Sequence, residues 1–394
     1  MKVIFLSTFK FPDNDAGSLR YSFLSKLFAK NGYTPYFIGK GKTSINTYTN
    51  GRYGFYTSLK SKSNNLFSRA FDTLYSFERK IVKEVKRISE PNDIIVIACF
   101  FSKTTNTKII KFATKNNIKV LFAVEEKYSK TEFRKHDFIS LSGFKKCESF
   151  YKNIQYYKRP IIAISSYIGE FARRANVPHI VIPFIYDEDL IISINDRKQS
   201  NLVKFFYAGA PGKKDLLLEM IEGFALLPPD CKRHIEFDIF GITSKYASTW
   251  LPNDLFNKTR DFIKFNGIVS REQIKKEIAN ADFSVLLRNS DEEFAKAGFP
   301  TKISESLFYG VPVITNISSD LGQYLKNGFN SIIVKGYDKK AFCESIKLAL
   351  NMSRCDLMNL KKNARDTSIK YLTTDCFDGV FRNFLLSLNN YRIK

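Results

Sequence analysis

The sequence predicts an α/β protein made of two successive domains, each a series of alternating strands and helices. Residues 3–7 form an apolar, strand-like run that leads through a polar loop into a helical pattern. Residues 204–208 begin a second series of the same kind, after a polar linker at 193–201. At 394 residues, with 44% hydrophobic content, the chain is long enough for two globular domains with separate cores.

In the first series, a helix is expected over about 18–31, because Leu19, Phe23 and Leu27 recur at helical spacing and Gly32 supplies the stop. No G-x-G-x-x-G pattern joins the first strand to this helix, which disfavours a dinucleotide-dependent oxidoreductase. Further strands are expected at 36–38, 94–98, 119–124, 161–165 and 180–183, with helices at 66–88, 105–116, 144–159 and 166–174.

The second series continues with expected strands at 236–240, 262–265, 281–287, 311–315 and 331–334, and the final stretch, 341–388, is predicted to be mostly helical. Its most informative part is 297–316, A-G-F-P-T-K-I-S-E-S-L-F-Y-G-V-P-V-I-T-N. A Gly-Phe-Pro turn opens a short helix there, and Gly310 closes it. A helix start can hold a phosphate, Lys302 adds a full charge beside it, and Glu305 could accept hydrogen bonds from a ribose.

The net charge of +23 is concentrated in the first half of the chain. Residues 1–200 contain 34 Lys and Arg against 17 Asp and Glu, whereas 201–394 contain 28 against 22. An excess of this kind favours an anionic partner such as a membrane surface, a phosphorylated lipid or nucleic acid, although coding bias is an alternative explanation.

No run of 18 apolar residues exists, and six cysteines without paired spacing indicate free thiols, so a cytoplasmic protein is expected.

The stretch 297–316 resembles the donor site of retaining nucleotide-sugar glycosyltransferases with the GT-B fold, those of family 4 or group 1. Segments 161–187 and 203–215 resemble the same family. Two positions differ from its usual pattern, because Ala210 stands in place of an arginine and Ala297 in place of the first of two glutamates, of which Glu305 is the second. An alternative reading is therefore a binding protein of this fold with impaired turnover.

The resemblance implies two Rossmann-like domains that face each other across a cleft. Residues 1–195 would bind the acceptor, residues 201–375 would bind the donor, and a helix at 376–394 would return to the first domain. A UDP- or GDP-sugar would give its sugar, with retention and without a metal, to a lipid-linked or polysaccharide acceptor of bacterial cell-surface synthesis. No cofactor and no nucleic acid are expected, although an RNA-binding α/β protein is a further alternative that the charge alone suggests.

The family also implies roles for individual residues. Lys213 and Lys214 would stabilise the leaving diphosphate, and Glu126, which follows the strand at 119–124, would face the acceptor. The expected donor-binding residues come from both domains; they are Gly17, Ser18, Gly209, Gly241, Ile268, Gly298, Phe299, Pro300, Thr301, Lys302 and Glu305.

Basic residues interleaved with aromatics suit an interfacial helix at 144–159, as do the lysines of the helix at 66–88. The residues expected at an acceptor or an anionic membrane are Lys80, Lys83, Lys145, Lys146 and Lys152. A helix that packs its aromatic side chains inward is the alternative.

The acidic triplets Asp13-Asn14-Asp15 and Asp187-Glu188-Asp189 read as solvated loops, and the three histidines show no metal-binding spacing.

Overall fold

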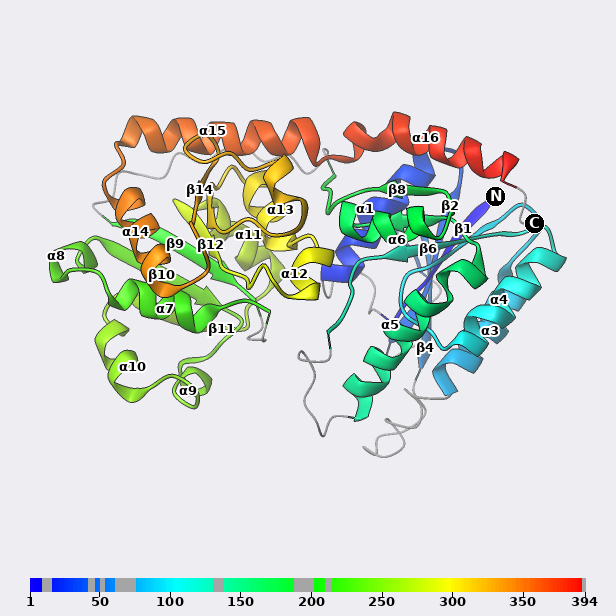
Figure 1. Ribbon diagram of the computed structural model, residues 1–394, viewed down its shortest axis with the longest axis horizontal. Coiled ribbons are helices and arrows are strands. Elements are labelled where there is room, and N and C mark those ends of the chain that lie inside the picture. The colour runs from blue at the N-terminus through cyan, green and yellow to red at the C-terminus, as the bar shows by residue number, and fades with distance from the viewer. Residues whose placement is uncertain are drawn as a thin grey trace. The chain divides into compact units, whose positions relative to one another are not determined.

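The computed structural model of the chain describes residues 1–8, 16–41, 47–49, 54–60, 76–129, 138–187, 202–209 and 214–391. They form two compact units (Figure 1). Unit 1 consists of Met1–Asp187 and Thr374–Lys394, and unit 2 is Glu188–Thr373. Each unit is a twisted sheet covered by helices, so the expected α/β class is confirmed.

The sheet of unit 1 has the order β3-β4-β2-β1-β5-β6-β7-β8. All of its strand pairs are parallel except β3 with β4. Its strands are β1 (Lys2–Leu6), β2 (Thr34–Gly41), β3 (Thr47–Thr49), β4 (Gly54–Lys60), β5 (Ile94–Ile97), β6 (Lys119–Val124), β7 (Ile161–Ala163) and β8 (His179–Val181). Apart from Lys2 and Lys119 at the starts of β1 and β6, the central strands are apolar, as is usual where helices cover both faces of a parallel sheet.

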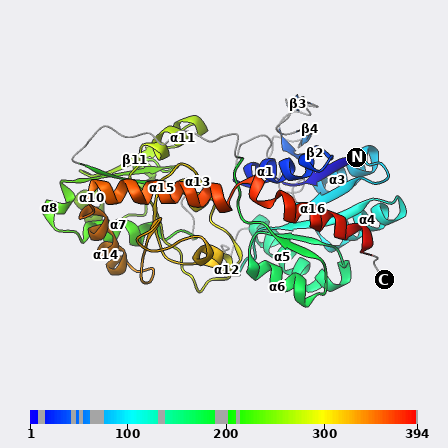
Figure 2. The same cartoon turned by 90° about the horizontal axis from the view of Figure 1, so that it is seen from above.

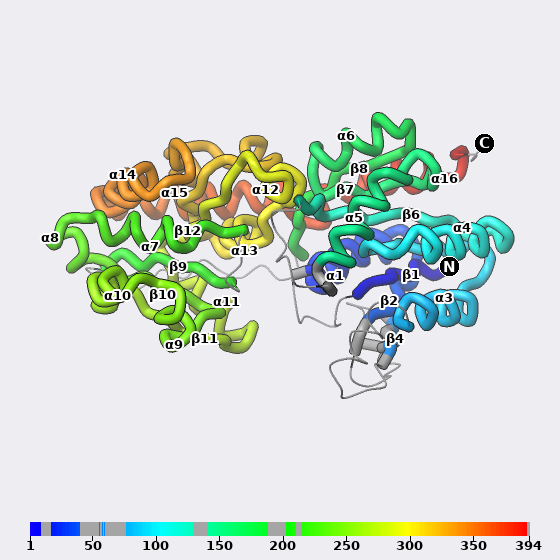
Figure 3. Tube along the Cα trace, turned by 60° about the horizontal axis from the view of Figure 1, so that its bottom comes forward, coloured from blue at the N-terminus to red at the C-terminus, as the bar shows by residue number. Residues whose placement is uncertain are grey.

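The helices of unit 1 are α1 (Ala16–Lys30), α3 (Phe77–Ile88), α4 (Lys103–Lys115), α5 (Phe138–Tyr157), α6 (Ser166–Arg174) and α16 (Thr374–Asn390). Ser102 and Ser165 cap α4 and α6 by accepting backbone N–H bonds from the first turn. Helix α6 lies beside β7 and β8 (Figure 3). The helix expected from residue 66 is seen from Phe77, and residues 66–75 lie outside the described part of the chain.

The last helix, α16, packs on the first, α1, although more than 340 residues separate them (Figures 1 and 2). The rings of Phe28 and Phe381 meet edge to face with their centroids 4.8 Å apart. Around them, Lys30 pairs with Asp375, and the amide of Asn31 donates to Asp378 Oδ1 at 3.2 Å. The predicted return of the C-terminal helix to the first domain is therefore confirmed.

The sheet of unit 2 is parallel throughout, in the order β11-β10-β9-β12-β13-β14. Its strands are β9 (Val203–Ala208), β10 (Ile235–Phe240), β11 (Ile263–Gly267), β12 (Phe283–Leu286), β13 (Val313–Thr315) and β14 (Ser331–Ile333). The chain adds β10 and β11 on one side of β9 and then places β12 on the other side. Such a reversal in strand order opens a crevice at the carboxyl ends of the two neighbouring strands, where ligands bind in open α/β sheets.

The longer helices of unit 2 bury apolar faces, whereas the short helix α8 (Pro229–Lys232) has no buried residue. The helices of this unit are α7 (Leu217–Ala225), α8, α9 (Ser244–Ala247), α10 (Asn253–Thr259), α11 (Arg271–Ala279), α12 (Glu293–Ala297), α13 (Thr301–Phe308), η4 (Ser319–Gln323), α14 (Lys339–Leu350) and α15 (Arg354–Tyr371). Helices α7 and α14 lie side by side, as do α13 and α15 (Figures 1 and 2). Within the described residues, none of the helices is long and apolar enough to cross a membrane.

Candidate functional site

The crevice between β9 and β12 in unit 2 contains a buried carboxylate that joins three separate elements. Asp215, which follows β9, accepts a bond from Arg288 Nε through Oδ1 at 3.0 Å. Its Oδ2 accepts from Lys302 Nζ at 2.7 Å and from the Tyr207 hydroxyl at 3.0 Å. These four residues, called the Asp215 cluster below, come from β9, the end of β12 and the first turn of α13.

Burial and the neighbouring charges shift the pKa values of Asp215 and Tyr207 in the Asp215 cluster. Burial opposes ionisation of Asp215, but the adjacent Lys302 and Arg288 outweigh it and hold the pKa of this carboxyl well below its usual range. Burial and the charge of Asp215 hold the pKa of Tyr207 far above the usual value for a phenol. The cluster therefore contains two cations, one anion and a neutral hydroxyl, a net charge of +1.

Gly209, at the end of β9, leaves the space that Lys302 occupies. A Cβ atom at position 209 would lie 2.7 Å from Lys302 Cε and 2.9 Å from its Nζ. The ammonium group also lies 5.3 Å from the centre of the Tyr207 ring. The sequence expected Gly209 and Lys302 to act together at the donor, and the structure brings the two residues into contact.

The turn that opens α13 places its residues in two different environments. The backbone N–H of Gly298 donates to Phe294 O at 2.9 Å, and Pro300 O accepts from Ile303 N at 3.0 Å, so both turn residues are engaged in local backbone bonds. The ring of Phe299 is buried and meets Tyr324 edge to face at 5.5 Å. Phe299 therefore belongs to the core, whereas Thr301 and Lys302 lie partly exposed in the first turn of the helix.

Glu305, one turn further along α13, is largely buried and already has a charged partner. The guanidinium Nη2 of Arg271, at the start of α11, lies 2.6 Å from Glu305 Oε1. Burial, together with the charge of Glu305, raises the pKa of Tyr309 to about 12. Arg271 thus contacts one of the two oxygens of the Glu305 side chain.

Two glycines shape the ends of β10 and β11 next to this site. Gly241 and Gly267 have φ values of +92° and +70°, a backbone region that residues other than glycine rarely adopt. Gly241 N donates to Gly267 O at 2.7 Å, and Gly267 N donates to Ile242 O at 2.8 Å. Ile268, one of the expected donor-binding residues, follows directly and is 88% exposed, which leaves an apolar side chain in solvent.

The loop after β9 is described only in part. Lys214 lies with its ammonium group 5.7 Å from the ring of Phe294 in α12. Lys213, expected to be catalytic, and Ala210 lie outside the described residues.

In unit 1, the expected donor residues Gly17 and Ser18 lie in the first turn of α1, and Ser18 is fully buried. One turn later, Arg20 is buried too. Its Nη1 and Nη2 donate to Pro183 O at 2.6 Å and Ile182 O at 2.9 Å, and its Nε lies 2.6 Å from Glu125 Oε1. Arg20 thus joins α1 to the segments that follow β6 and β8.

The two neighbouring glutamates after β6 have different surroundings. Burial raises the pKa of Glu125 to about 7, although Arg20 and Tyr21 act in the opposite direction. Glu126, which the sequence assigned to the acceptor, is half-buried, and its backbone oxygen accepts a bond from the Tyr151 hydroxyl at 3.0 Å. The protonation state of Glu125 therefore changes near neutral pH.

The five lysines expected at an acceptor or membrane surface differ in their solvent exposure and in their ion pairs. Lys146 Nζ lies 2.6 Å from Glu78 Oε1, a buried carboxylate that also accepts bonds from Ser102 and Thr105. Lys146 is therefore held in the fold. Lys83, Lys145 and Lys152 are exposed, and Lys80 is half-buried.

Sequence reasoning missed three of the residues that form the site in unit 2: Asp215, Arg288 and Arg271. Each follows the carboxyl end of a strand, namely β9, β12 or β11. That position is a usable signal, because ligand contacts in open α/β sheets come from these ends. What the sequence does not contain is the strand order that places β12 beside β9.

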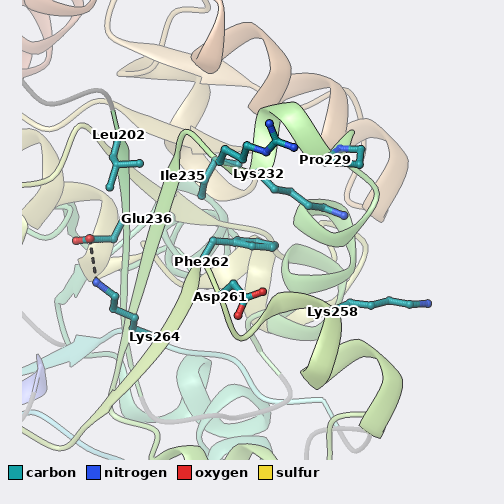
Figure 4. Close-up of a pocket in the computed structure, with 10 residues that line it drawn as sticks. Leu202, Pro229, Lys232, Ile235, Glu236, Lys258, Asp261, Phe262 and Lys264 are labelled. Atoms are coloured by element: carbon teal, nitrogen blue, oxygen red, sulfur yellow. Dashed lines mark hydrogen bonds and ion pairs between the residues drawn. The ribbon is translucent and has the colours of Figure 1, made fainter.

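A separate hollow of about 400 Å³ lies at the opposite, amino edge of the same sheet (Figure 4). Its basic residues are all paired: Lys264 Nζ with Glu236 at 3.0 Å, Lys258 with Asp254 at 3.5 Å, Arg233 with Asp230 at 3.6 Å, and Lys232 with Ala225 O at 2.7 Å. Because these cations already have partners at a polar surface, the hollow is a weaker candidate than the crevice between β9 and β12. Across the described residues, no group of His, Cys, Asp and Glu could hold a metal ion.

Two Rossmann-like units, with a cationic cluster at the strand-order reversal of unit 2, define the GT-B class of proteins. Within unit 2, residues 193–367 match the model of a family described as glycosyl transferases group 1. This match agrees with the group 1 resemblance that the sequence predicted, and it lies in the second half of the chain. No curated protein sequence matches the chain.

Solved structures with the same fold confirm the architecture. Sucrose-phosphate synthase from Thermosynechococcus elongatus has a TM-score of 0.74 and 13% identity, over 99% of this chain and 100% of that one. Anabaena Alr3699/HepE in complex with UDP has a TM-score of 0.69 and 12% identity, over 98% and 100%. A glycosyltransferase from Rickettsia africae has a TM-score of 0.68 and 14% identity, over 99% of both chains.

Proposed function

We propose that the protein is a retaining glycosyltransferase that moves a hexose from a UDP- or GDP-sugar to a hydroxyl group of a lipid-linked or polysaccharide acceptor. The observation that carries the proposal is the crevice between β9 and β12, where Lys302 and Glu305 lie on one short helix beside Gly209. A cation next to a helix start suits a diphosphate, and a carboxylate one turn later suits a ribose. The family match and the UDP bound by Anabaena HepE support the same donor class.

In this proposal, unit 2 holds the nucleotide and stabilises its departure. The bond between the anomeric carbon and the diphosphate oxygen breaks, and its electron pair leaves with that oxygen. Lys302 and, in the loop after β9, Lys213 or Lys214 stabilise the negative charge that develops there. The acceptor oxygen bonds to the same face of the anomeric carbon, and its proton passes to the departing phosphate. Lysine side chains thus supply the positive charge in place of a metal.

Unit 1 takes the acceptor in this proposal. Glu126 follows a sheet strand at the edge where open α/β sheets bind ligands, and the aromatic rings of Phe100 and Tyr128 lie next to that edge, 6.1 Å apart. A lipid-linked acceptor of bacterial surface-polysaccharide synthesis would bring the protein to the inner face of the cell membrane. The basic surface of unit 1 would assist that attachment.

Incubation with radiolabelled UDP- and GDP-sugars tests the proposal. We expect slow hydrolysis of one donor in the absence of acceptor, and transfer when lipid-linked or polysaccharide acceptors are added. Binding of a nucleotide sugar without any turnover would instead favour the second candidate, a GT-B binding protein, which the replacement of two family positions by Ala210 and Ala297 suggests. Absence of both binding and turnover, with retention of RNA, would support the third candidate, an RNA-binding protein.

A further inference from the structure

Arg288 has two features that the proposed mechanism does not use. Its backbone is held at the end of β12 by one side chain, since Arg288 N donates to Asn316 Oδ1 at 3.0 Å and Asn316 Nδ2 donates to Arg288 O at 2.8 Å. Its guanidinium is oriented by the Nε bond to Asp215 at 3.0 Å. Both the backbone and the guanidinium of Arg288 are therefore held in place at the carboxyl edge of the sheet.

The part of Arg288 that remains available is the part that binds phosphate. Among the residues that the structure describes, its side chain makes only the one polar contact, through Nε, so the two terminal nitrogens have no protein partner. The side chain is 13% exposed, so most of it is buried and only a small part reaches solvent. A guanidinium presents its N–H groups as a planar fork that fits the oxygens of a phosphate.

Lys302 contacts the same carboxylate, Asp215, as Arg288 does. Its ammonium lies 2.7 Å from the second oxygen of Asp215 and its side chain is 23% exposed. The two cations are therefore held on the two oxygens of one carboxylate, so that they cannot move apart. Since the carboxylate cancels only one of the two positive charges, the cluster keeps a net charge of +1 and attracts an anion.

We propose that Arg288 and Lys302 together bind the diphosphate of the nucleotide sugar, and that Asp215 is the positioning residue that sets their spacing. This inference rests on the proposed function and adds to it a residue that replaces the missing arginine at position 210. Asp215 is a poor base, because the two adjacent cations lower the pKa of its carboxyl and so disfavour its protonation. Tyr207 and Gly209 serve the same arrangement, the first as a hydrogen-bond donor to Asp215 and the second by leaving room for Lys302.

Titration calorimetry with four probes tests the inference: UDP, GDP, inorganic pyrophosphate and uridine. For R288Q we expect the affinity for pyrophosphate and for the preferred nucleoside diphosphate to fall about 10- to 100-fold, the loss typical of a hydrogen bond to a charged group. Uridine affinity should not change, since it has no phosphate. R288K should give an intermediate loss, because a lysine restores the charge without the fork.

R260Q is the matched control, since Arg260 lies exposed at the end of α10 in the same unit and its removal takes away one positive charge elsewhere. D215N should weaken diphosphate binding in the same way as R288Q. It should also lower kcat more than it raises KM, because the charge develops fully only when the diphosphate leaves. Urea unfolding of each variant shows whether the fold is retained.

The outcomes separate the inference from the proposed function. Wild-type affinity for both diphosphates in R288Q would overturn the inference while leaving the donor class intact. A parallel loss for uridine and diphosphates in both Arg288 variants would also overturn it, because it would show a general distortion of the site. If pyrophosphate binds through Arg288 but no nucleotide does, the phosphate-binding role of Arg288 stands, whereas the nucleotide-sugar ligand and with it the proposed function fail. If the wild-type protein binds none of the four probes, both fail.

Discussion

Glu305 is largely buried, and its Oε1 lies 2.6 Å from the guanidinium of Arg271. A ribose hydroxyl that donates to this carboxylate gains a charge-assisted hydrogen bond. The replacement E305Q keeps the shape of the side chain but removes its charge. We expect the affinity for the nucleotide donor to fall by about 1.5–3 kcal/mol, as measured by calorimetry. E272Q, on the exposed first turn of α11, is the control, and unchanged affinity in E305Q would remove Glu305 from the site.

Glu125 makes the stability of the protein depend on pH. Its pKa is about 7 in the folded protein, above its ordinary value of 4.5, so the folded state holds this proton more tightly than the unfolded state does. The stabilisation is complete below about pH 4.5 and is lost as the pH rises through 7. Each unit of such a shift corresponds to about 1.4 kcal/mol, which sets an upper limit of roughly 3 kcal/mol.

The variant E125Q cannot lose a proton in this range. We therefore expect its free energy of unfolding, relative to that of the wild type, to rise between pH 5 and pH 8, as followed by urea titrations at several pH values. E126Q is the matched control at the neighbouring position and should not show this trend. A constant difference between E125Q and wild type across the range would mean that Glu125 is ionised like an ordinary surface carboxylate.

At the scale of elements, the start of α13 and the loop after β9 should act as one phosphate-binding feature. Single alanine substitutions at Lys302, Lys213 and Lys214 remove charge from it. We expect kcat/KM to fall on the order of 100-fold wherever the charge acts on the leaving group. The alanine variant of exposed Lys276, on α11, provides the comparison. Near-normal rates in all three variants would show that the diphosphate binds elsewhere.

The contact between α1 and α16 should be a main source of stability for unit 1. Phe381 is fully buried and packs on Phe28. We expect F381A to lower the free energy of unfolding by about 3–5 kcal/mol, because the smaller side chain leaves a cavity. The change is measured by denaturant unfolding. V380A, at the exposed neighbouring position, should be nearly neutral, and an equally small effect for F381A would mean that the helix is loosely docked.

The order and type of these elements were largely predictable, because their signals are local. A helix was expected at 105–116 and is found at Lys103–Lys115, and the Gly-Phe-Pro turn does open α13 at Thr301. The Asp215 cluster was not predictable, since Asp215 and Lys302 are 87 residues apart and meet only through the order of the strands. Likewise, the burial of the Phe299 ring was not predictable, because an aromatic side chain in a turn gives no sign of which way it faces.

At the scale of the whole molecule, the positive charge of the first half predicts reversible attachment to anionic membranes. Each lysine or arginine near such a surface contributes about 1 kcal/mol, and salt weakens the attraction. We expect the protein to float with vesicles that contain phosphatidylglycerol at low salt, and to be released at high salt. Lys83 and Lys152 are exposed and suited to this role, whereas Lys146 is occupied by Glu78.

The double variant K83E/K152E should weaken flotation, while K258E, an exposed substitution in unit 2, should have little effect. Equal binding to neutral vesicles, or none to anionic vesicles at low salt, would assign the charge to a soluble acidic acceptor or to coding bias.

The return of α16 to α1 also has a consequence for the synthesis of the chain. Unit 1 is discontinuous in sequence, and the whole of unit 2 is translated between its two parts. At about 5–20 residues per second, the apolar surface of α1 that Phe381 covers stays open on the ribosome for roughly 20–70 s, the time needed to synthesise the chain from the end of α1 to Phe381. During that interval, Phe28 of the nascent chain lacks its Phe381 partner and can contact other exposed apolar surfaces. We therefore expect chaperone binding and aggregation during expression to depend on α1 more than on the sheets.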